Sequence, residues 1–165
     1  MEIRKLTKED FQVISQAFAE IGWNKPISLF EKYSQDEVDG ARFCLVATYD
    51  GNFAGYVTLL KISGYEYGNF GRIPEISDLN VLPRFRNNGI GTALIQKCEA
   101  IAREFSDNIG LGVGLTADYS NALNLYLKLG YKFDGNGIAY NGKTLQFGAN
   151  TTLDDALNLY LIKMC

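Results

Sequence analysis

A six-residue segment with two glycines, set between runs of different hydrophobic periodicity, most constrains how this chain can fold. The segment Arg86–Gly91 (Arg-Asn-Asn-Gly-Ile-Gly) follows a strand-like run from Ile76 to Leu82 and opens a run with helical spacing. Glycines let a ligand come close to the backbone, and the unpaired amides at the start of a helix favour an anion. The order of strand, glycine turn and helix therefore predicts a phosphate-binding loop and a cofactor with a phosphate linker.

The helix after this loop is predicted from apolar side chains that recur at helical spacing: Leu94, Ile95, Cys98, Ile101, Ala102 and Phe105. Polar residues lie between them, so we expect one face to pack and the other to meet water. Pro83 follows the strand, and a proline there removes an amide donor and ends sheet pairing. An ordinary strand-to-helix connection, with glycines chosen for turn geometry, is the alternative interpretation.

Two other phosphate-binding patterns match the chain only formally. The dinucleotide pattern G-x-G-x-x-G fails because Leu94 stands at the position of its third glycine. The segment Gly137–Thr144 matches the nucleoside-triphosphate pattern G-x-x-x-x-G-K-[ST], with Gly142-Lys143-Thr144 at its end. Strand-forming Ile138 and Tyr140 lie inside it, and Asn141-Gly142 is a strong hairpin turn. We therefore predict a β-hairpin here and not a triphosphate site.

Length and composition indicate one globular domain over residues 1–165, since 47% of the residues are hydrophobic and no biased segment interrupts the chain. The absence of histidine excludes Ser-His-Asp and Cys-His catalysis. The three cysteines are dispersed, so we expect thiols, no disulfide framework and no metal site. A general base must then be a carboxylate, a tyrosine, a lysine or water.

The net charge of −3 argues against a nucleic-acid partner. No apolar run is long enough to cross a bilayer, and the N-terminus starts directly into a strand-like pattern without a signal segment. We therefore expect a cytoplasmic protein without a membrane partner. A homodimer is compatible with the sequence, although no residue pattern decides it.

The remaining pattern predicts strands and helices in a mixed order. Helices are expected at about 8–20, before Asp39, at 90–105 and at 120–129, and strands at 42–49, 52–60, 74–82, 111–115, 131–133 and 157–162. Asp50-Gly51 predicts a tight hairpin between the first two of these strands. The order predicts an α/β fold with a mixed sheet and helices on both faces.

Two segments resemble the signature segments of the GNAT N-acetyltransferase superfamily. The first is Pro83-x-Phe85-Arg86-x-x-Gly89-Ile90-Gly91-x-x-Leu94, and the second is Ala122-x-x-Leu125-Tyr126-x-Lys128-x-Gly130-Tyr131. The order of elements is similar to that fold over nearly the whole chain. The stretch Asp118-Tyr119-Ser120-Asn121-Ala122 through Asp134-Gly135-x-Gly137 resembles a bacterial branch of the superfamily. The resemblance implies a mostly antiparallel sheet with a central parallel strand pair.

The resemblance also implies acetyl-CoA as co-substrate, without a metal. Its pyrophosphate would bind amides of the loop residues Arg86, Asn87, Asn88, Gly89, Ile90, Gly91 and Thr92. Backbone groups of Leu79, Asn80 and Val81 would hold the pantetheine arm and the acetyl carbonyl. Asn121 would reach the pantetheine, although many relatives place this asparagine where the chain has Tyr119.

Glu75 is the predicted general base. It starts the strand and, by alternation, shares a face with Ser77, Leu79 and Val81. It lies eleven residues before Arg86 (86 − 75), the spacing at which histone-acetylating relatives carry their glutamate base. An exposed strand-end carboxylate is the alternative. Asp78 is the second candidate base, but alternation places it on the opposite face, where we expect a structural role.

Tyr126 is the predicted general acid, because the resemblance places a tyrosine there near the coenzyme sulfur. An ordinary core aromatic, at helical spacing with Ala122 and Leu129, is the alternative. Four further aromatic residues are candidates for lining an acceptor pocket: Trp23, Tyr33, Tyr65 and Tyr67.

The predicted function is an N-acetyltransferase that moves an acetyl group from acetyl-CoA to a primary amine of a small molecule or peptide, by direct transfer in a ternary complex. The alternative is a non-catalytic acyl-CoA-binding regulatory module. The fold alone does not identify the acceptor.

Overall fold

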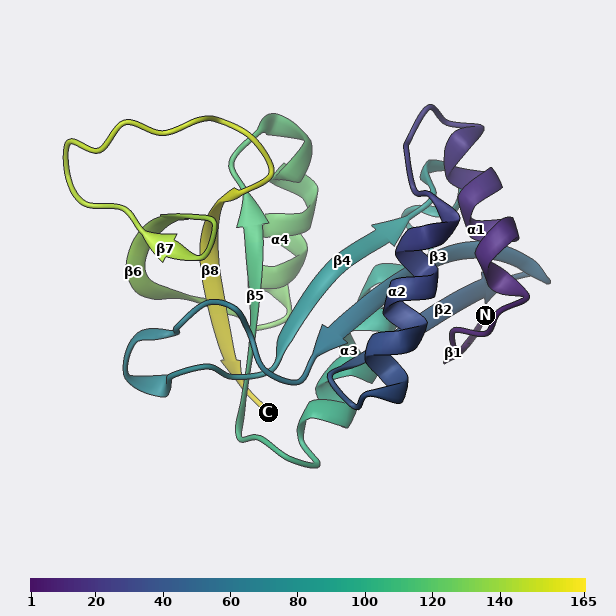
Figure 1. The fold of residues 1–165 in the computed structure, drawn as a ribbon, viewed down its shortest axis with the longest axis horizontal. Coiled ribbons are helices and arrows are strands. Elements are labelled where there is room, and N and C mark those ends of the chain that lie inside the picture. Colours follow the sequence, from purple (N-terminus) through teal and green to yellow (C-terminus); the bar gives the residue numbers. More distant parts are fainter. The chain divides into compact units, whose positions relative to one another are not determined.

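Four α-helices and eight β-strands form the structure, a computed structural model that describes all residues 1–165 (Figure 1). The helices are α1 (Asp10–Ala19), α2 (Ile27–Val38), α3 (Ile90–Ala102) and α4 (Ser120–Lys128). The strands are β1 (Glu2–Lys5), β2 (Arg42–Tyr49), β3 (Asn52–Leu60), β4 (Glu75–Val81), β5 (Asn108–Gly114), β6 (Lys132–Tyr140), β7 (Lys143–Thr144) and β8 (Leu157–Met164).

The strands form one sheet in the order β1-β2-β3-β4-β5-β8-β6-β7. Strands β4 and β5 run parallel, with Glu75 opposite Gly110. The pairs β1–β2, β2–β3, β5–β8, β6–β8 and β6–β7 are antiparallel. This confirms the predicted α/β fold with a mostly antiparallel sheet that includes a parallel pair.

The chain forms two compact units, each with its own core. The first unit comprises residues 1–61 and 77–98, and the second comprises residues 62–76 and 99–165. Strand β4 and helix α3 contribute residues to both units. The single domain expected over 1–165 stays a prediction.

In the first unit, α1 and α2 pack against one face of the β2–β3 hairpin (Figure 1). This core contains Leu6, Phe11, Ile14, Phe18, Phe30, Tyr33, Cys44, Val46, Phe53, Tyr56 and Leu82. Leu45 and Val57 are also buried, so both faces of the hairpin are covered. The predicted turn is confirmed, because Asp50 and Gly51 both have positive φ, 50° and 77°, as a tight hairpin turn requires.

In the second unit, β5 pairs with β8, and β8 pairs with β6 on its other side (Figure 1). A small core forms from Tyr65, Tyr67, Ile73, Ala139 and Tyr160. The hairpin predicted around Asn141-Gly142 is confirmed, because Tyr140 pairs with Lys143 across a turn with φ of 50° and 72°. The formal triphosphate pattern is therefore a strand, a turn and a strand, without a following helix.

Strand β6 is longer than the sequence predicts. It continues from Lys132 to Tyr140, whereas apolar residues alone suggested an end at Phe133. Its pairing with β8 is irregular between Phe133 and Ile138, where Gly135 and Gly137 have φ of 87° and 81°. Glycines usually end a strand pattern, but here they allow the backbone to bend and then resume pairing.

Candidate active site

The predicted phosphate-binding loop precedes α3 in the first unit. Its residues 86–89 are exposed, whereas the side chain of Ile90 is buried and anchors the helix. The first intrahelical bond runs from the Ala93 amide to the Gly89 carbonyl, at 3.0 Å. The amides of Ile90, Gly91 and Thr92 precede this bond, so they lie at the positive end of the helix dipole with no intrahelical acceptor.

Contacts within the loop hold it in this shape. Asn87 and Gly89 have positive φ, 64° and 75°, a backbone conformation found in loops that bind anions through their amides. The Asn88 side-chain amide donates to the carbonyls of Phe85 and Arg86, both at 3.2 Å. A Cβ added to Gly89 would meet no atom within 4 Å, so backbone conformation and not crowding requires glycine here. An exposed, preformed array of amides fits a pyrophosphate group.

Strand β4 leads into this loop, and it is not regular. Asp78 has φ of 50°, in the left-handed region that residues other than glycine rarely adopt. The period-two alternation from Glu75 through Leu79 and Val81 was therefore the wrong description, because a residue in this conformation redirects the strand that follows it. Leu79, Asn80 and Val81 are half-buried residues.

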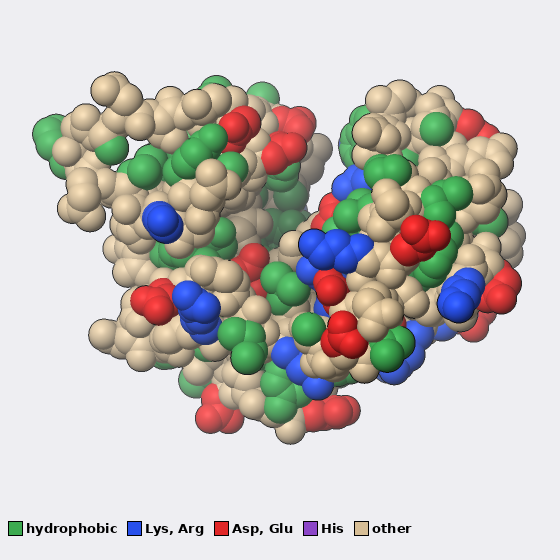
Figure 2. Space-filling view, in the orientation of Figure 1, with side chains coloured by type: hydrophobic (Ala, Val, Ile, Leu, Met, Phe, Trp, Pro, Cys, Tyr) green, Lys and Arg blue, Asp and Glu red, His purple; other side chains and the backbone are tan.

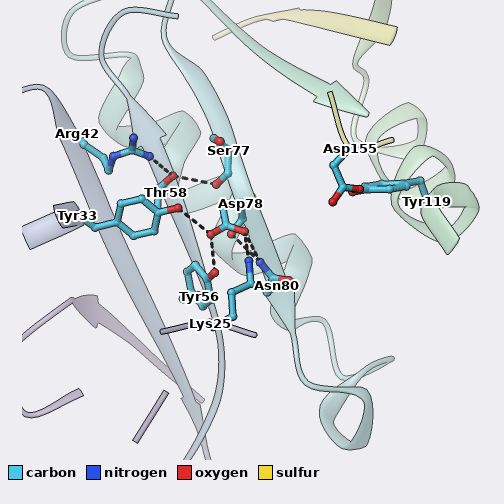
Figure 3. Close-up of polar contacts among 10 residues, drawn as sticks. All are labelled: Lys25, Tyr33, Arg42, Tyr56, Thr58, Ser77, Asp78, Asn80, Tyr119 and Asp155. Carbon is cyan, nitrogen blue, oxygen red and sulfur yellow. Dashed lines mark hydrogen bonds and ion pairs between the residues drawn. The ribbon is translucent and has the colours of Figure 1, made fainter. Parts of the chain in front are cut away.

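The carboxylate of Asp78 is the centre of a polar cluster in the first unit, which we call the Asp78 clamp (Figure 3). Lys25 Nζ lies 2.6 Å from Oδ1, and the hydroxyls of Tyr33 and Tyr56 donate to Oδ2 at 2.9 and 2.5 Å. The side-chain amide of Asn80 donates to Oδ1 at 2.8 Å and to the Asp78 carbonyl at 3.1 Å. Figure 3 shows these side chains pointing toward Asp78 from the loop after α1, from α2 and from β3.

The clamp keeps Asp78 ionised. Burial raises the pKa of its carboxyl, but the charge of Lys25 and the hydrogen bonds from Lys25, Tyr56 and Tyr33 outweigh this, so the pKa is lowered. Burial beside the same carboxylate raises the pKa of both tyrosines. A carboxylate with a lowered pKa is a weak proton acceptor, which agrees with the structural role expected for Asp78.

Glu75 lies in the second unit, where two hydroxyls hold its carboxylate. Ser63 Oγ and the Tyr67 hydroxyl both donate to Glu75 Oε2, the latter at 3.1 Å. Ser63 and Tyr67 are almost fully buried, with 1% of each residue exposed. Burial, and then the nearby Glu75 carboxylate, raises the pKa of Tyr67, so this phenol stays a donor at neutral pH.

The segment between β3 and β4 carries both hydroxyls and is fastened within the second unit. The Tyr65 ring stacks on Tyr160 with centroids 3.7 Å apart, and its hydroxyl donates to Asp134 at 2.5 Å. The Tyr67 ring occupies space that exists because Gly110 has no side chain, since an added Cβ would lie 2.2 Å from the ring. The position of the Glu75 carboxylate is therefore determined by packing as well as by hydrogen bonds.

Tyr126 is on α4 in the second unit and is 7% exposed. Its ring contacts Tyr131 edge-on, with centroids 6.3 Å apart. Burial raises the pKa of Tyr126 to about 12, so the phenol is protonated at neutral pH. Asn121 is exposed in the first turn of the same helix, and the neighbouring Tyr119 donates to Asp155 at 3.0 Å (Figure 3).

The structure thus groups the predicted residues by unit. The cofactor-binding residues of β4 and the phosphate loop lie in the first unit, and Glu75, Asn121 and Tyr126 lie in the second. The sequence did not predict the contact of Ser63 with Glu75 or those of Lys25 and Tyr56 with Asp78. No local pattern marks a residue that contacts its partner only through tertiary packing. Of the aromatic candidates, Tyr33, Tyr65 and Tyr67 are buried, and Trp23 is 40% exposed and stacks on Phe18.

Other features of the chain bear on partners. No helix combines the length and the apolar character needed to cross a membrane. The cysteines are thiols, and no group of three or more Cys, Asp or Glu side chains is arranged to hold a metal ion. On the face shown in Figure 2, basic and acidic side chains are interspersed, so this face has no extended patch of a single sign.

Comparison with known proteins links these features to a family. Residues 2–131 match the sequence model described as the acetyltransferase (GNAT) family. An N-alpha-acetyltransferase of Sulfurisphaera tokodaii is 30% identical over 115 residues, which are 66% of this chain and 66% of that protein. An uncharacterized N-acetyltransferase of Mycobacterium bovis is 26% identical over 119 residues, which are 72% of this chain and 67% of that protein.

A solved structure shares the fold. The PaiA N-acetyltransferase of Thermoplasma acidophilum, determined in complex with coenzyme A, superposes with a TM-score of 0.64 at 21% identity. The match covers 99% of this chain and 98% of that one.

Proposed function

The chain belongs to the GNAT acetyltransferase family, and from this premise we propose that it moves an acetyl group from acetyl-CoA to a primary amine by direct transfer in a ternary complex. The observation that carries the proposal is the array of amides at the start of α3, with positive φ at Asn87 and Gly89. Such an array binds a diphosphate by backbone groups alone. The acceptor is an amine of a small molecule or a peptide, and a cytoplasmic location and a homodimer are parts of the same proposal.

Acetyl-CoA supplies an activated thioester, and residues of the first unit would hold it. The amides of Arg86 to Thr92 would bind the pyrophosphate, and the backbone of Leu79, Asn80 and Val81 would bind the pantetheine arm. Amides aimed at the acetyl carbonyl would stabilise negative charge that develops on its oxygen. Asn121, exposed on α4, is the proposed side-chain contact to the pantetheine.

Glu75 is the proposed general base, which would take a proton from the amine directly or through water. Its carboxylate is suited to this task because Ser63 and Tyr67 hold one oxygen in place. A base that is already oriented loses little conformational freedom when the acceptor binds.

Tyr126 is the proposed general acid, which would return a proton to the leaving sulfur. Its hydroxyl makes no hydrogen bond to another side chain, and burial keeps it protonated at neutral pH, with a pKa of about 12. A buried, protonated phenol can donate its proton to a leaving group on which negative charge develops.

The cofactor assignment is tested by calorimetric titration of the protein with acetyl-CoA and, separately, with ATP. The variant Gly89→Glu places a carboxylate in the anion site, and we expect it to weaken acetyl-CoA binding by at least about 100-fold. Gly148→Glu is the matched control, because Gly148 is also exposed, has φ of 82° and has no atom within 4 Å of an added Cβ. No binding of acetyl-CoA by the unaltered protein would refute the proposal.

The catalytic assignment is tested by the dependence of kcat on pH, with an amine acceptor found by screening. We expect Glu75→Gln and Tyr126→Phe each to lower kcat by about 100-fold, a typical contribution of general acid–base catalysis. Wild-type rates in both variants would refute the assigned roles. Binding of acetyl-CoA without turnover on any amine would favour a non-catalytic acyl-CoA-binding module instead.

A further inference from the structure

The backbone of Asp78 adopts a conformation that a strand does not require. Its φ of 50° interrupts β4 directly before Leu79. Residues other than glycine persist in this region only where their surroundings hold them there. The cause must therefore lie in the contacts around Asp78, all of which belong to the first unit.

The Asp78 clamp supplies these contacts from several elements. A lysine before α2, a tyrosine on α2 and a tyrosine on β3 converge on one carboxylate, which is 20% exposed. The Asn80 side chain bridges the carboxylate and the carbonyl of Asp78. Because one amide group binds both, the orientation of the Asp78 side chain is coupled to the conformation of its backbone.

The residues on either side of Asp78 are held as well. Before it, the buried Thr58 hydroxyl donates to the Ser77 carbonyl at 3.0 Å and accepts from Arg42 at 2.8 Å. After it, β3 comes close to β4, because a Cβ added to Gly55 would lie 2.4 Å from the Asn80 carbonyl oxygen. Beyond the strand, Arg86 Nε donates to the Val81 carbonyl at 3.3 Å, which connects this backbone to the phosphate loop.

We propose that Asp78 is a positioning residue whose clamp sets the backbone of Leu79–Val81 in the conformation that receives the pantetheine arm and the acetyl group. The inference rests on the proposed function, since it concerns how the same cofactor is held. Asp78 itself takes no part in proton transfer. Its carboxylate acts through the backbone, by keeping the strand irregular at the residue before the binding segment.

The test compares binding of the whole cofactor with binding of a fragment that lacks the pantetheine arm. Asp78→Asn keeps the size of the side chain but removes the charge that Lys25 and the two phenols bind. We expect it to weaken acetyl-CoA binding by about tenfold, the effect of one displaced hydrogen bond to the ligand. Binding of 3′-phosphoadenosine 5′-diphosphate, which has the diphosphate but no pantetheine arm, should change by less than about twofold, because the phosphate loop keeps its own contacts.

A second, milder variant keeps the inference testable if Asp78→Asn does not fold. Tyr33→Phe removes one hydroxyl and leaves the ion pair of Lys25 with Asp78, and we expect about threefold weaker acetyl-CoA binding. Tyr140→Phe and Asp154→Asn are the matched controls, because these residues form an exposed hydrogen bond of 3.0 Å in the second unit. Neither control should change either titration.

The outcomes are distinct. Acetyl-CoA binding within twofold of wild type in both Asp78→Asn and Tyr33→Phe overturns the inference, as does an equal loss of both ligands in the two variants. If the unaltered protein does not bind acetyl-CoA, the proposed function itself fails. Selective loss of acetyl-CoA affinity, with the diphosphate fragment still bound, supports the inference.

Discussion

Two carboxylates on β4, Glu75 and Asp78, are three residues apart (78 − 75) and have different surroundings. Glu75 accepts hydrogen bonds from two hydroxyls, those of Ser63 and Tyr67. Asp78 accepts two phenolic hydrogen bonds as well, but it also forms an ion pair of 2.6 Å with Lys25. The contacts described for Glu75 come from uncharged hydroxyls, whereas Asp78 also contacts a lysine.

The comparison indicates that the side chains in contact with a carboxylate affect its ionisation and orientation more than its being Asp or Glu does. A lysine stabilises the ionised form by its charge, and the pKa of Asp78 is lowered, so Asp78 is an anion at neutral pH. Hydroxyl donors orient a carboxylate without adding a net charge of their own, as Ser63 and Tyr67 do for Glu75. Two positions three residues apart on one strand therefore have differently built surroundings.

The largest expected effect on stability comes from filling the space at Gly110 that the Tyr67 ring occupies. Gly110→Ala puts a Cβ 2.2 Å from the Tyr67 ring, so the ring must move and its bond to Glu75 must break. We expect a loss of about 3 kcal/mol in the free energy of unfolding, the upper range for overpacking, measured by urea denaturation. Gly64→Ala is the control, because an added Cβ there meets no atom within 4 Å. Equal stability of the two variants would contradict the packing described for Tyr67.

The second prediction concerns the charge of Lys25 beside Asp78. Lys25→Met keeps an unbranched side chain but leaves the Asp78 carboxylate without its cation. Because both side chains are about 20% exposed, we expect a loss of about 2 kcal/mol, below the range for a fully buried pair. The exposed pair of Arg72 and Glu66 gives the control, since Arg72→Met should cost less than about 1 kcal/mol. If Lys25→Met costs no more than Arg72→Met, the clamp does not depend on charge.

The third prediction tests whether neutral donors orient Glu75. Tyr67→Phe removes one hydrogen bond to the carboxylate and should cost about 1 kcal/mol of stability. If Glu75 is the base, as we propose, Tyr67→Phe should also lower kcat by about tenfold, because its carboxylate is less well held. Tyr140→Phe is the control in the same unit, since the Tyr140 hydroxyl donates to Asp154 at 3.0 Å. A kcat for Tyr67→Phe equal to that of Tyr140→Phe would remove the orienting role.

The smallest expected effect is a dependence on pH of the stability that Asp78 contributes. The pKa of Asp78 is lowered below its ordinary value of 3.8 in the folded protein. Its contribution to stability is therefore fully present above pH 3.8 and is lost as the pH falls through the lower, folded value. The stability difference between wild type and Asp78→Asn should be constant from pH 7 down to about 4 and should shrink at lower pH. Urea denaturation across this range measures it, and a difference that grew on acidification would have the wrong sign.

Local patterns predicted much of the fold because their causes are local. The bounds of β2 and β3, Arg42–Tyr49 and Asn52–Leu60, were predicted correctly from β-rich runs around Asp50-Gly51. Helix α3 begins at Ile90 as expected, since the glycine turn and the apolar spacing lie within a few residues. The end of β6 was wrong, because paired strands can continue through glycines that interrupt the sequence pattern.

The order of strand, turn and helix around Arg86–Gly91 followed from the sequence by itself, because helix ends and glycine conformations depend on near neighbours. The anion site predicted there stays a prediction. The surroundings of the two carboxylates did not follow from the sequence. Asp78 meets Lys25 and Tyr56 from 53 and 22 residues away, and its positive φ interrupts the alternation that counting along a strand assumes. Such contacts form only when distant segments pack, so tertiary structure alone decided that Asp78 forms an ion pair with Lys25.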